Sequence, residues 1–189
     1  MFTEQILKSI LSLKTFSAAK SAHTPALEGI HISVNAETKT ITALATDRFA
    51  AARMVITVPE VAGTSWERNV SIATLNAALA TVKASGGSVS VFPEAHMPEF
   101  PTKVSGLIDK AVNSVNFTDG ADFNAKYLGA ISKVNVGGDK SGRWTIRTVR
   151  MANHNDPQGV HAKNKRLVAT ATYGDYEVAV VVMPLLTRN

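Results

Sequence analysis

The feature that most constrains the fold is a run of six apolar residues, 178–183, that leads directly into Pro184. A valine-rich run of this length favours a β-strand. Proline has no N–H to donate to a sheet ladder, so the strand has to end, or become an edge strand, at Pro184. Leu185 and Leu186 follow as a short apolar tail. We expect this tail to form part of a groove for a partner; the alternative is that it folds onto the protein's own core.

The composition indicates a globular protein of one or two domains. The chain has 189 residues, of which 45% are hydrophobic and 19% are charged, which is enough to build a real core. It has no cysteine, so disulfides and thiolate metal sites are excluded. Lys and Arg exceed Asp and Glu by 20 to 15, a balance that permits a polyanionic partner without establishing one. No apolar run is long enough to span a bilayer, so we expect a cytoplasmic protein with no membrane partner.

Hydrophobic spacing predicts a mixed α+β fold with antiparallel strands. Helices are expected after the capping residues Thr3 and Ser71 and over residues 103–115 and 124–134. Strands are expected over residues 27–34, 40–44, 49–58, 69–72, 88–92, 144–149, 166–172 and 176–182. Pro93, Pro98 and Pro101 interrupt regular structure, which predicts two domains, 1–100 and 101–189. A helix followed by strands recurs along the chain and suggests an internal repeat.

The sequence gives little support to catalysis. The five histidines are scattered and have no acidic partner at metal-ligand spacing. The glycine-rich segment 137–142 lacks the spacing of a phosphate loop and lies between a helix and a strand, so we interpret it as a turn. Asp47 has no nucleophile or second carboxylate near it in the sequence. We therefore predict no catalytic residue, no metal site and no cofactor.

Four short segments carry a resemblance to a known family. Thr-Pro-Ala-Leu-Glu-Gly at residues 24–29 is followed, after a strand, by Ala-Thr-Asp-Arg-Phe-Ala at residues 45–50. Phe-Asn-Ala-Lys-Tyr-Leu occupies residues 123–128, and Met-Pro-Leu occupies residues 183–185. In this order they resemble the bacterial DNA sliding clamps, the DNA polymerase III beta-clamp family. Its patterns are Arg-Pro-x-Leu-x-Gly, Ala-Thr-Asp-x-x-Arg-Leu-Ala, Phe-Asn-Pro-Lys-Tyr-Leu and a terminal Met-Pro-hydrophobic segment.

The resemblance implies a DNA-clamp fold, in which antiparallel sheets carry helices that line one face. That helix face would meet duplex phosphates without reading sequence, through Lys8, Lys83, Lys126 and Lys133. The resemblance also implies a groove for a linear peptide of a DNA polymerase or another replication protein. Matching the family's patterns residue by residue assigns this groove to Leu27, Thr46, Arg48, Phe49, Val181, Met183, Pro184 and Leu185.

The chain departs from the family's pattern in three respects. Its net charge is +5, whereas bacterial clamps tend to be acidic. Two residues that the family has between Asp47 and Arg48 are missing here, and Leu186 stands where the family has an arginine. We therefore expect a peptide preference that differs from the bacterial one.

The function implied by the resemblance is that of a DNA polymerase processivity factor, which encircles duplex DNA and performs no chemistry. A chain with two clamp-like domains cannot close a ring alone, so a head-to-tail homotrimer is expected. A chain this short would suit a virus, acting in the cytoplasm of its bacterial host. Two alternatives stay open: a clamp-derived adaptor or decoy that forms no ring, and a small enzyme on an unrelated α+β scaffold.

Overall fold

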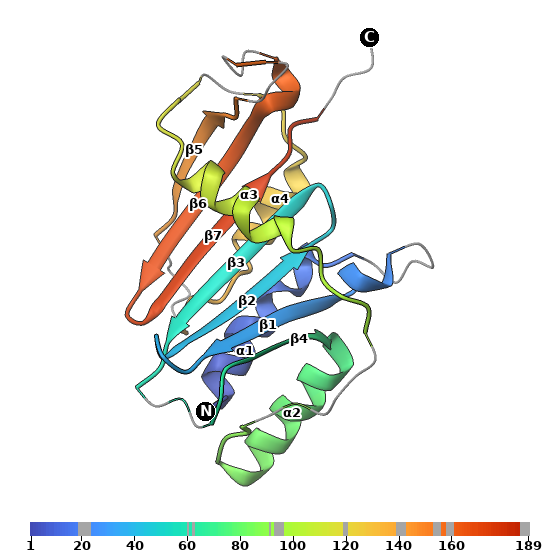
Figure 1. Cartoon of the computed structure of the whole chain (residues 1–189), viewed down its shortest axis with the longest axis vertical. Helices are drawn as coiled ribbons and strands as arrows, with labels where there is room; N and C mark the ends of the chain where they lie inside the picture. Colours follow the sequence, from blue (N-terminus) through green and yellow to red (C-terminus); the bar gives the residue numbers. More distant parts are fainter. Residues whose placement is uncertain are drawn as a thin grey trace.

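The computed structural model describes residues 1–18, 24–59, 61, 63–90, 92, 97–118, 121–138, 143–152, 156–157 and 161–185. Within these ranges the chain forms one seven-stranded sheet and four α-helices (Figure 1). The strands are β1 (Gly29–Asn35), β2 (Thr40–Thr46), β3 (Ala50–Thr57), β4 (Trp66–Ser71), β5 (Thr145–Arg150), β6 (Lys165–Tyr173) and β7 (Tyr176–Val182). The helices are α1 (Glu4–Ser12), α2 (Ile72–Ser85), α3 (Lys103–Val112) and α4 (Ala125–Ile131).

The sheet is antiparallel throughout, in the order β4-β1-β2-β3-β7-β6-β5. Its first four strands come from the first 71 residues and the other three come from residues 145–182. The two groups join where β3 pairs with β7, in a register that runs from Ala50 opposite Val182 to Ile56 opposite Tyr176. We call this pairing the β3–β7 seam. The predicted α+β class with antiparallel pairing is confirmed.

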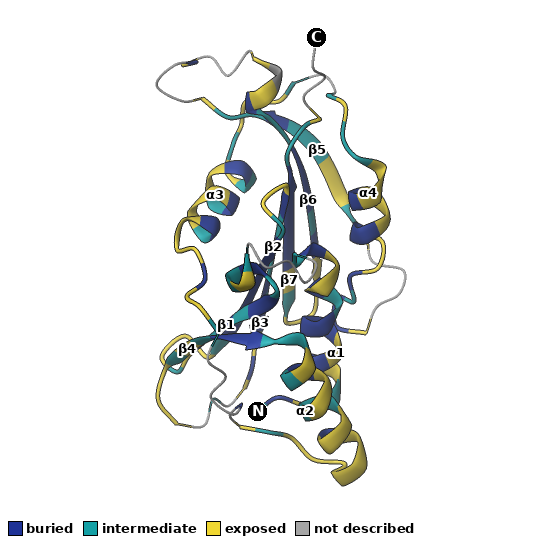
Figure 2. Ribbon diagram, turned by 90° about the vertical axis from the view of Figure 1, so that its right-hand side faces the viewer, coloured by how far each residue is buried: buried dark blue, intermediate teal, exposed yellow. Residues whose placement is uncertain are grey.

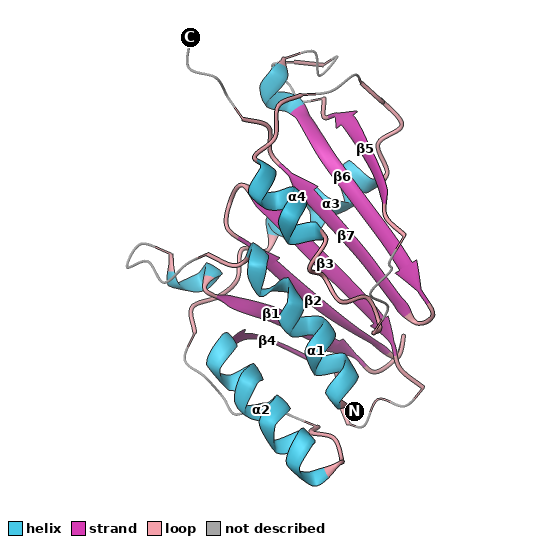
Figure 3. Ribbon diagram, turned by 180° about the vertical axis from the view of Figure 1, so that it is seen from behind, coloured by secondary structure: helices cyan, strands magenta, loops and turns pink. Residues whose placement is uncertain are grey.

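Helices cover both faces of the sheet. Figures 2 and 3 show α1, α2 and α4 on one face, and Figure 2 shows α3 alone on the other. The clamp-like arrangement with helices lining one face therefore holds for three of the four described helices. α3 packs on the opposite face because its buried residues Val104, Ile108 and Ala111 meet Ala179 and Val181 of β7.

Burial on both faces explains the apolar run that constrained the fold. Val178, Val180 and Val182 belong to the core beneath α1, α2 and α4, while Ala179 and Val181 belong to the core beneath α3. All five are at most 8% exposed. The strand therefore shows no alternation of apolar and polar residues, since neither face meets water.

The predicted helix caps Thr3 and Ser71 are present in the structure, and Asn124 caps α4 in the same way. The side chains of Thr3, Ser71 and Asn124 each accept a hydrogen bond from a backbone N–H in the first turn of α1, α2 and α4. The expected strand at residues 88–92 is wrong: among the described residues it is reduced to a single bridge between Val89 and Phe2. Among the described helices, none combines the length and hydropathy needed to cross a membrane.

Candidate functional site

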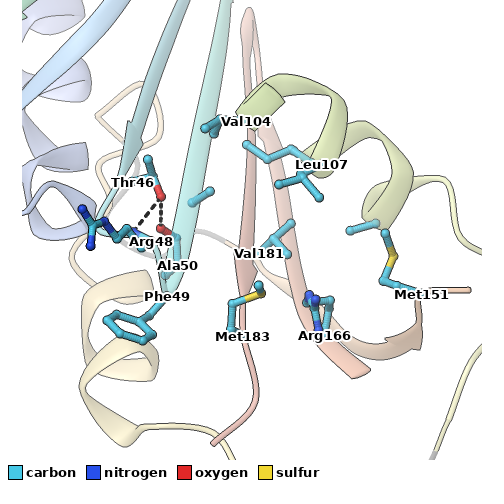
Figure 4. A pocket seen from close by; sticks show the side chains of 13 residues that line it. Thr46, Arg48, Phe49, Ala50, Val104, Leu107, Met151, Arg166, Val181 and Met183 are labelled. Carbon is cyan, nitrogen blue, oxygen red and sulfur yellow. Dashed lines mark hydrogen bonds between the residues drawn. The ribbon is translucent and has the colours of Figure 1, made fainter. Parts of the chain in front are cut away.

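A small apolar pocket lies on the α3 face, where β2, β3 and β7 end near α3 (Figure 4). Its volume is about 60 Å³, which suits one or two side chains of a peptide better than a whole small-molecule ligand. The lining residues come from β2, β3 and the turn between them, from α3, β6 and β7, and from the residues that follow β5 and β7. They are Thr46, Arg48, Phe49, Ala50, Ala51, Val104, Leu107, Ile108, Ala111, Met151, Arg166, Val181 and Met183.

The structure brings five of the eight predicted groove residues together in this pocket: Thr46, Arg48, Phe49, Val181 and Met183. Leu27 lies beside it, buried in the core beneath α3. Pro184 is half-buried and Leu185 is about half-exposed, so this part of the tail is not folded into the core. Leu186 lies outside the described residues. The groove assignment as a whole stays a prediction.

The β2–β3 turn is held by its own side chains. The Thr46 hydroxyl donates to the Ala50 carbonyl at 2.7 Å and accepts the Arg48 N–H at 3.1 Å (Figure 4). One oxygen of the Asp47 carboxylate accepts the N–H groups of Phe49 and Ala50. Arg48 adopts a φ of 78°, a left-handed conformation that is costly for an arginine and persists because these bonds fix the turn. The result is a rigid turn with Phe49 exposed at the pocket.

The second Asp47 oxygen connects the turn to α4. It accepts the Tyr127 hydroxyl at 2.6 Å and lies 3.5 Å from the Lys126 ammonium. Burial, together with this bond to Asp47, raises the pKa of Tyr127 well above its usual range. The hydroxyl therefore remains a hydrogen-bond donor at every physiological pH. Asp47, for which the sequence offered no catalytic partner, thus has a structural role at the pocket.

The segment after β7 forms the other side of the pocket. The Met183 N–H donates to the Phe49 carbonyl at 2.7 Å, which extends the β3–β7 seam by one bond. The Leu185 N–H donates to the Asp122 carbonyl at 2.8 Å, just before α4. Pro184 lies between these two bonds and has no N–H to satisfy. The sheet pairing therefore ends at the proline, as its chemistry requires.

Sequence reasoning missed the part of the pocket that α3 and β6 contribute. Val104, Leu107, Ile108 and Ala111 were recognised only as the apolar spacing of a helix. Arg166 stood in an expected strand with no motif around it. No sequence signal set Leu107 apart, because its spacing matches that of the buried stripe; the structure shows that it is 50% exposed.

The four predicted DNA-facing lysines all lie on or beside the helices of the opposite face. Lys8 is on α1 and Lys83 is on α2, which pack side by side (Figure 3). Lys126 is the second residue of α4, and Lys133 follows the helix as an exposed residue. Lys8 pairs with Glu4 at 2.6 Å, and this hydrogen bond lowers the pKa of Glu4. Lys126 contacts Asp47 and the Tyr127 ring. Nothing tests the role of these lysines, which stays a prediction.

The chemistry of the pocket is that of binding. Apolar side chains and backbone make most of its surface, with Thr46 and two arginines as its polar groups. In the part of the chain that the structure describes, no three His, Asp or Glu side chains are grouped as metal ligands. The arrangement can bury an apolar side chain of a partner and offer it a positive charge.

Comparison with known proteins establishes the fold. No family model matches the sequence, and no curated protein is similar to it. Solved structures do match: the DNA polymerase sliding clamp from Pseudomonas aeruginosa, with 13% identity and a TM-score of 0.51, covers 98% of this chain. DNA polymerase III, beta chain, from Streptococcus pneumoniae gives the same identity, TM-score and coverage. The sliding clamp from Bacillus subtilis has 12% identity and a TM-score of 0.50, and the match covers 99% of this chain.

The chain therefore has a sliding-clamp-like fold, as the sequence resemblance implied. At 12–13% identity the likeness concerns the fold alone. The chain spans 64–65% of the length of these structures, so it is substantially shorter than the clamps it resembles.

Proposed function

We propose that this protein is a sliding clamp, a processivity factor that holds a replication protein on duplex DNA and performs no chemistry. The observation that carries the proposal is the placement of two surfaces on opposite faces of one sheet. The pocket lies on the α3 face, and the four predicted DNA-facing lysines lie on or beside α1, α2 and α4 on the other face. Both surfaces can be occupied at the same time, which is what a tether requires.

The pocket is the proposed docking point for a linear peptide of a DNA polymerase or another replication protein. Phe49 and Leu107 are large apolar side chains at the pocket that remain 63% and 50% exposed. Exposed apolar groups around a small pocket are typical of a site that buries an anchor residue of a partner. The rigid β2–β3 turn lowers the entropic cost of binding, since it is already ordered.

The helix face is the proposed DNA-facing surface. Lys8, Lys83, Lys126 and Lys133 would contact phosphates electrostatically, without reading bases. Loose contacts of this kind permit sliding, since no base-specific bond is broken at each step. The net charge of +5 agrees with a polyanionic partner.

The proposed assembly is a head-to-tail homotrimer of two clamp-like domains, residues 1–100 and 101–189. Three such chains would supply the six domains that a clamp ring contains. A short clamp of this kind suits a compact replication system such as that of a virus, working in the cytoplasm of a bacterial host. The alternative is a clamp-derived adaptor that forms no ring and acts through protein contacts.

Topological retention on DNA tests the clamp proposal. The protein is placed on a nicked circular duplex at low salt, separated from free protein, and the duplex is then cut once. A sliding ring stays on the circle and is lost from the linear product, whereas an adaptor shows no such difference. Equal retention on both forms would contradict the clamp proposal.

A charge-reversal pair tests the helix face in the same assay. Lys83→Glu combined with Lys133→Glu is expected to reduce retention on the circle at least about tenfold, since contacts to phosphates dominate affinity. Lys103→Glu combined with Lys110→Glu changes the net charge equally on the exposed side of α3. This control is expected to retain binding; equal losses in both pairs would contradict a DNA-facing role for the helix face.

A further inference from the structure

The charged groups of the pocket all have one sign. Arg48 and Arg166 are the charged residues among those that line it, and no Asp or Glu is part of the lining. In Figure 4 the Arg166 guanidinium lies close to Met183 and below Val181, whereas the Arg48 guanidinium points away from the other labelled side chains. Arg166 is therefore the cation that a bound peptide would meet.

The Arg166 guanidinium is held in place, but no carboxylate in the described part of the chain neutralises it. Its Nη1 donates to the backbone carbonyls of Lys163 and Lys165 at 2.5 and 2.7 Å. Among the residues that the structure describes, no ion pair includes Arg166. Arg53, another arginine on the α3 face, forms an ion pair with Asp109 at 2.6 Å. Arg166 thus differs from Arg53 in having no carboxylate partner among the described residues.

Burial makes this charge costly in the free protein. The guanidinium is partly removed from water, and this desolvation lowers the pKa of Arg166. An arginine nevertheless remains protonated at neutral pH, so a poorly solvated positive charge faces an apolar pocket. A carboxylate brought in by a ligand would accept charge-assisted hydrogen bonds from the planar guanidinium and offset that desolvation.

We propose that the pocket selects peptides that carry a carboxylate next to an apolar anchor residue, and that Arg166 is the residue that recognises it. The inference rests on the proposed peptide-docking function and adds the chemistry of the partner. The apolar side chain contacts Leu107, Val181 and Met183, and the carboxylate pairs with Arg166. The carboxylate belongs to an Asp or Glu side chain or to the peptide's own C-terminus, since both present the same two oxygens.

An array of immobilised octapeptides tests this inference with the whole protein. Each peptide has one Leu or Phe, and every neighbouring position carries in turn Asp, Asn, Glu or Gln. A parallel set compares a free C-terminal carboxylate with a carboxamide. For the strongest binders the dissociation constants of acid and amide are then measured by fluorescence anisotropy. We expect the acid to bind at least about fivefold more tightly than its amide partner, with a difference that shrinks at high salt.

Three variants assign the preference to Arg166. Arg166→Gln is expected to bind the acid and amide peptides alike, and Arg166→Lys is expected to keep part of the preference because it keeps the charge. Arg143→Gln removes an exposed arginine outside the pocket and is expected to keep the full preference. Circular dichroism checks that each variant is folded.

The remaining outcomes separate this inference from the proposed function. Equal binding of acid and amide peptides by the natural protein overturns the inference and leaves peptide docking standing. A preference that survives in Arg166→Gln overturns the role of Arg166. If no peptide binds at all, peptide docking at this pocket is overturned, and the inference falls with it.

Discussion

Gly29, the first residue of β1, lies where the backbone of β4 passes too closely for any side chain. A Cβ at this position would lie 2.5 Å from the Val70 carbonyl oxygen and 2.8 Å from the Met97 methyl carbon. Steric crowding therefore explains the glycine at the last position of the Pro-x-Leu-x-Gly pattern. We expect Gly29→Ala to lower the free energy of unfolding by about 1–3 kcal/mol, because backbone atoms cannot move aside cheaply.

Gly129 provides the matched control for this substitution. It lies in α4, where an added Cβ would meet nothing within 4 Å. Gly129→Ala is expected to leave the free energy of unfolding unchanged or to raise it by about 0.5–1 kcal/mol, since alanine favours a helix. Urea unfolding of both variants measures the two effects, and a similar loss in each would contradict the steric explanation.

His31 makes the stability depend on pH. It is largely buried on β1 and stacks on Phe100 with ring centroids 5.2 Å apart. Burial lowers its pKa below the ordinary value of 6.5, and the nearby Glu67 opposes this only in part. The unfolded chain therefore binds a proton more readily than the folded protein, so the stabilisation is complete above pH 6.5 and is lost as the pH falls below it.

Urea unfolding between pH 5 and pH 8 measures the contribution of His31. We expect the free energy of unfolding of the natural protein to decrease on acidification more steeply than that of His31→Gln. His161 is exposed, so His161→Gln is expected to leave the natural pH dependence in place. A slope that is the same with and without His31 would show that other groups control the acid sensitivity.

At the scale of elements, two neighbouring residues of α3 are expected to differ in role: one stabilises the core and the other binds the peptide. Ile108 is fully buried against the sheet, whereas Leu107 is half-exposed at the pocket. Ile108→Ala is expected to lower the free energy of unfolding by about 2–4 kcal/mol through a core cavity. Leu107→Ala is expected to cost under about 1 kcal/mol of stability but to weaken peptide binding roughly tenfold. Urea unfolding and fluorescence anisotropy on both variants distinguish these effects, and unimpaired peptide binding by Leu107→Ala would contradict its role at the pocket.

The elements themselves were largely predictable from the sequence, because caps and spacing are local signals. Thr3 and Ser71 indicated two helix starts, spacing indicated the helix near residue 124, and the segment Tyr176–Val182 was recognised as a strand with its bounds. The face that α3 would cover was not predictable. Its apolar stripe shows that one side is buried, but a sheet that is apolar on both faces accepts such a helix on either side.

The candidate site was predictable only where a motif marked it. Thr46 and Met183 belong to patterns that the resemblance supplied, and the structure brings them to one pocket. Leu107 and Arg166 reach the same pocket from elements distant in the sequence. No local sequence pattern indicates that residues so far apart will meet at one site. Leu27 was assigned to the groove, but the structure buries it beneath α3, since a residue's place in a motif does not determine its exposure.

At the scale of the whole molecule, the oligomeric state distinguishes a ring-forming clamp from an adaptor. A closed ring of three 20.1 kDa chains would have a mass of about 60 kDa, and we expect its subunits to pair through the edge strands of the sheet. The edge strands are β4 and β5, and β5 exposes Ile146 at 53%. Light scattering on a sizing column, across a range of concentrations, is expected to give the trimer mass.

A substitution on the edge strand β5 tests whether this edge forms the contact between subunits. Ile146→Lys is expected to shift the mass towards the monomer, since a lysine on an edge strand disfavours pairing with another chain. Lys103→Glu, on the exposed side of α3, is expected to leave the mass unchanged. A monomer at every concentration of the natural protein would contradict the ring and favour the adaptor.

The β3–β7 seam has a consequence for the synthesis of the protein on the ribosome. It pairs residues 50–56 with residues 176–182, and the pocket uses side chains from both segments. Contacts between segments so distant in the sequence form late, because β7 is synthesised long after β3 and a long loop has to be closed. A nascent chain that has not yet produced β7 lacks one wall of the pocket. We therefore expect the pocket to form only after β7 and Met183 have left the ribosome.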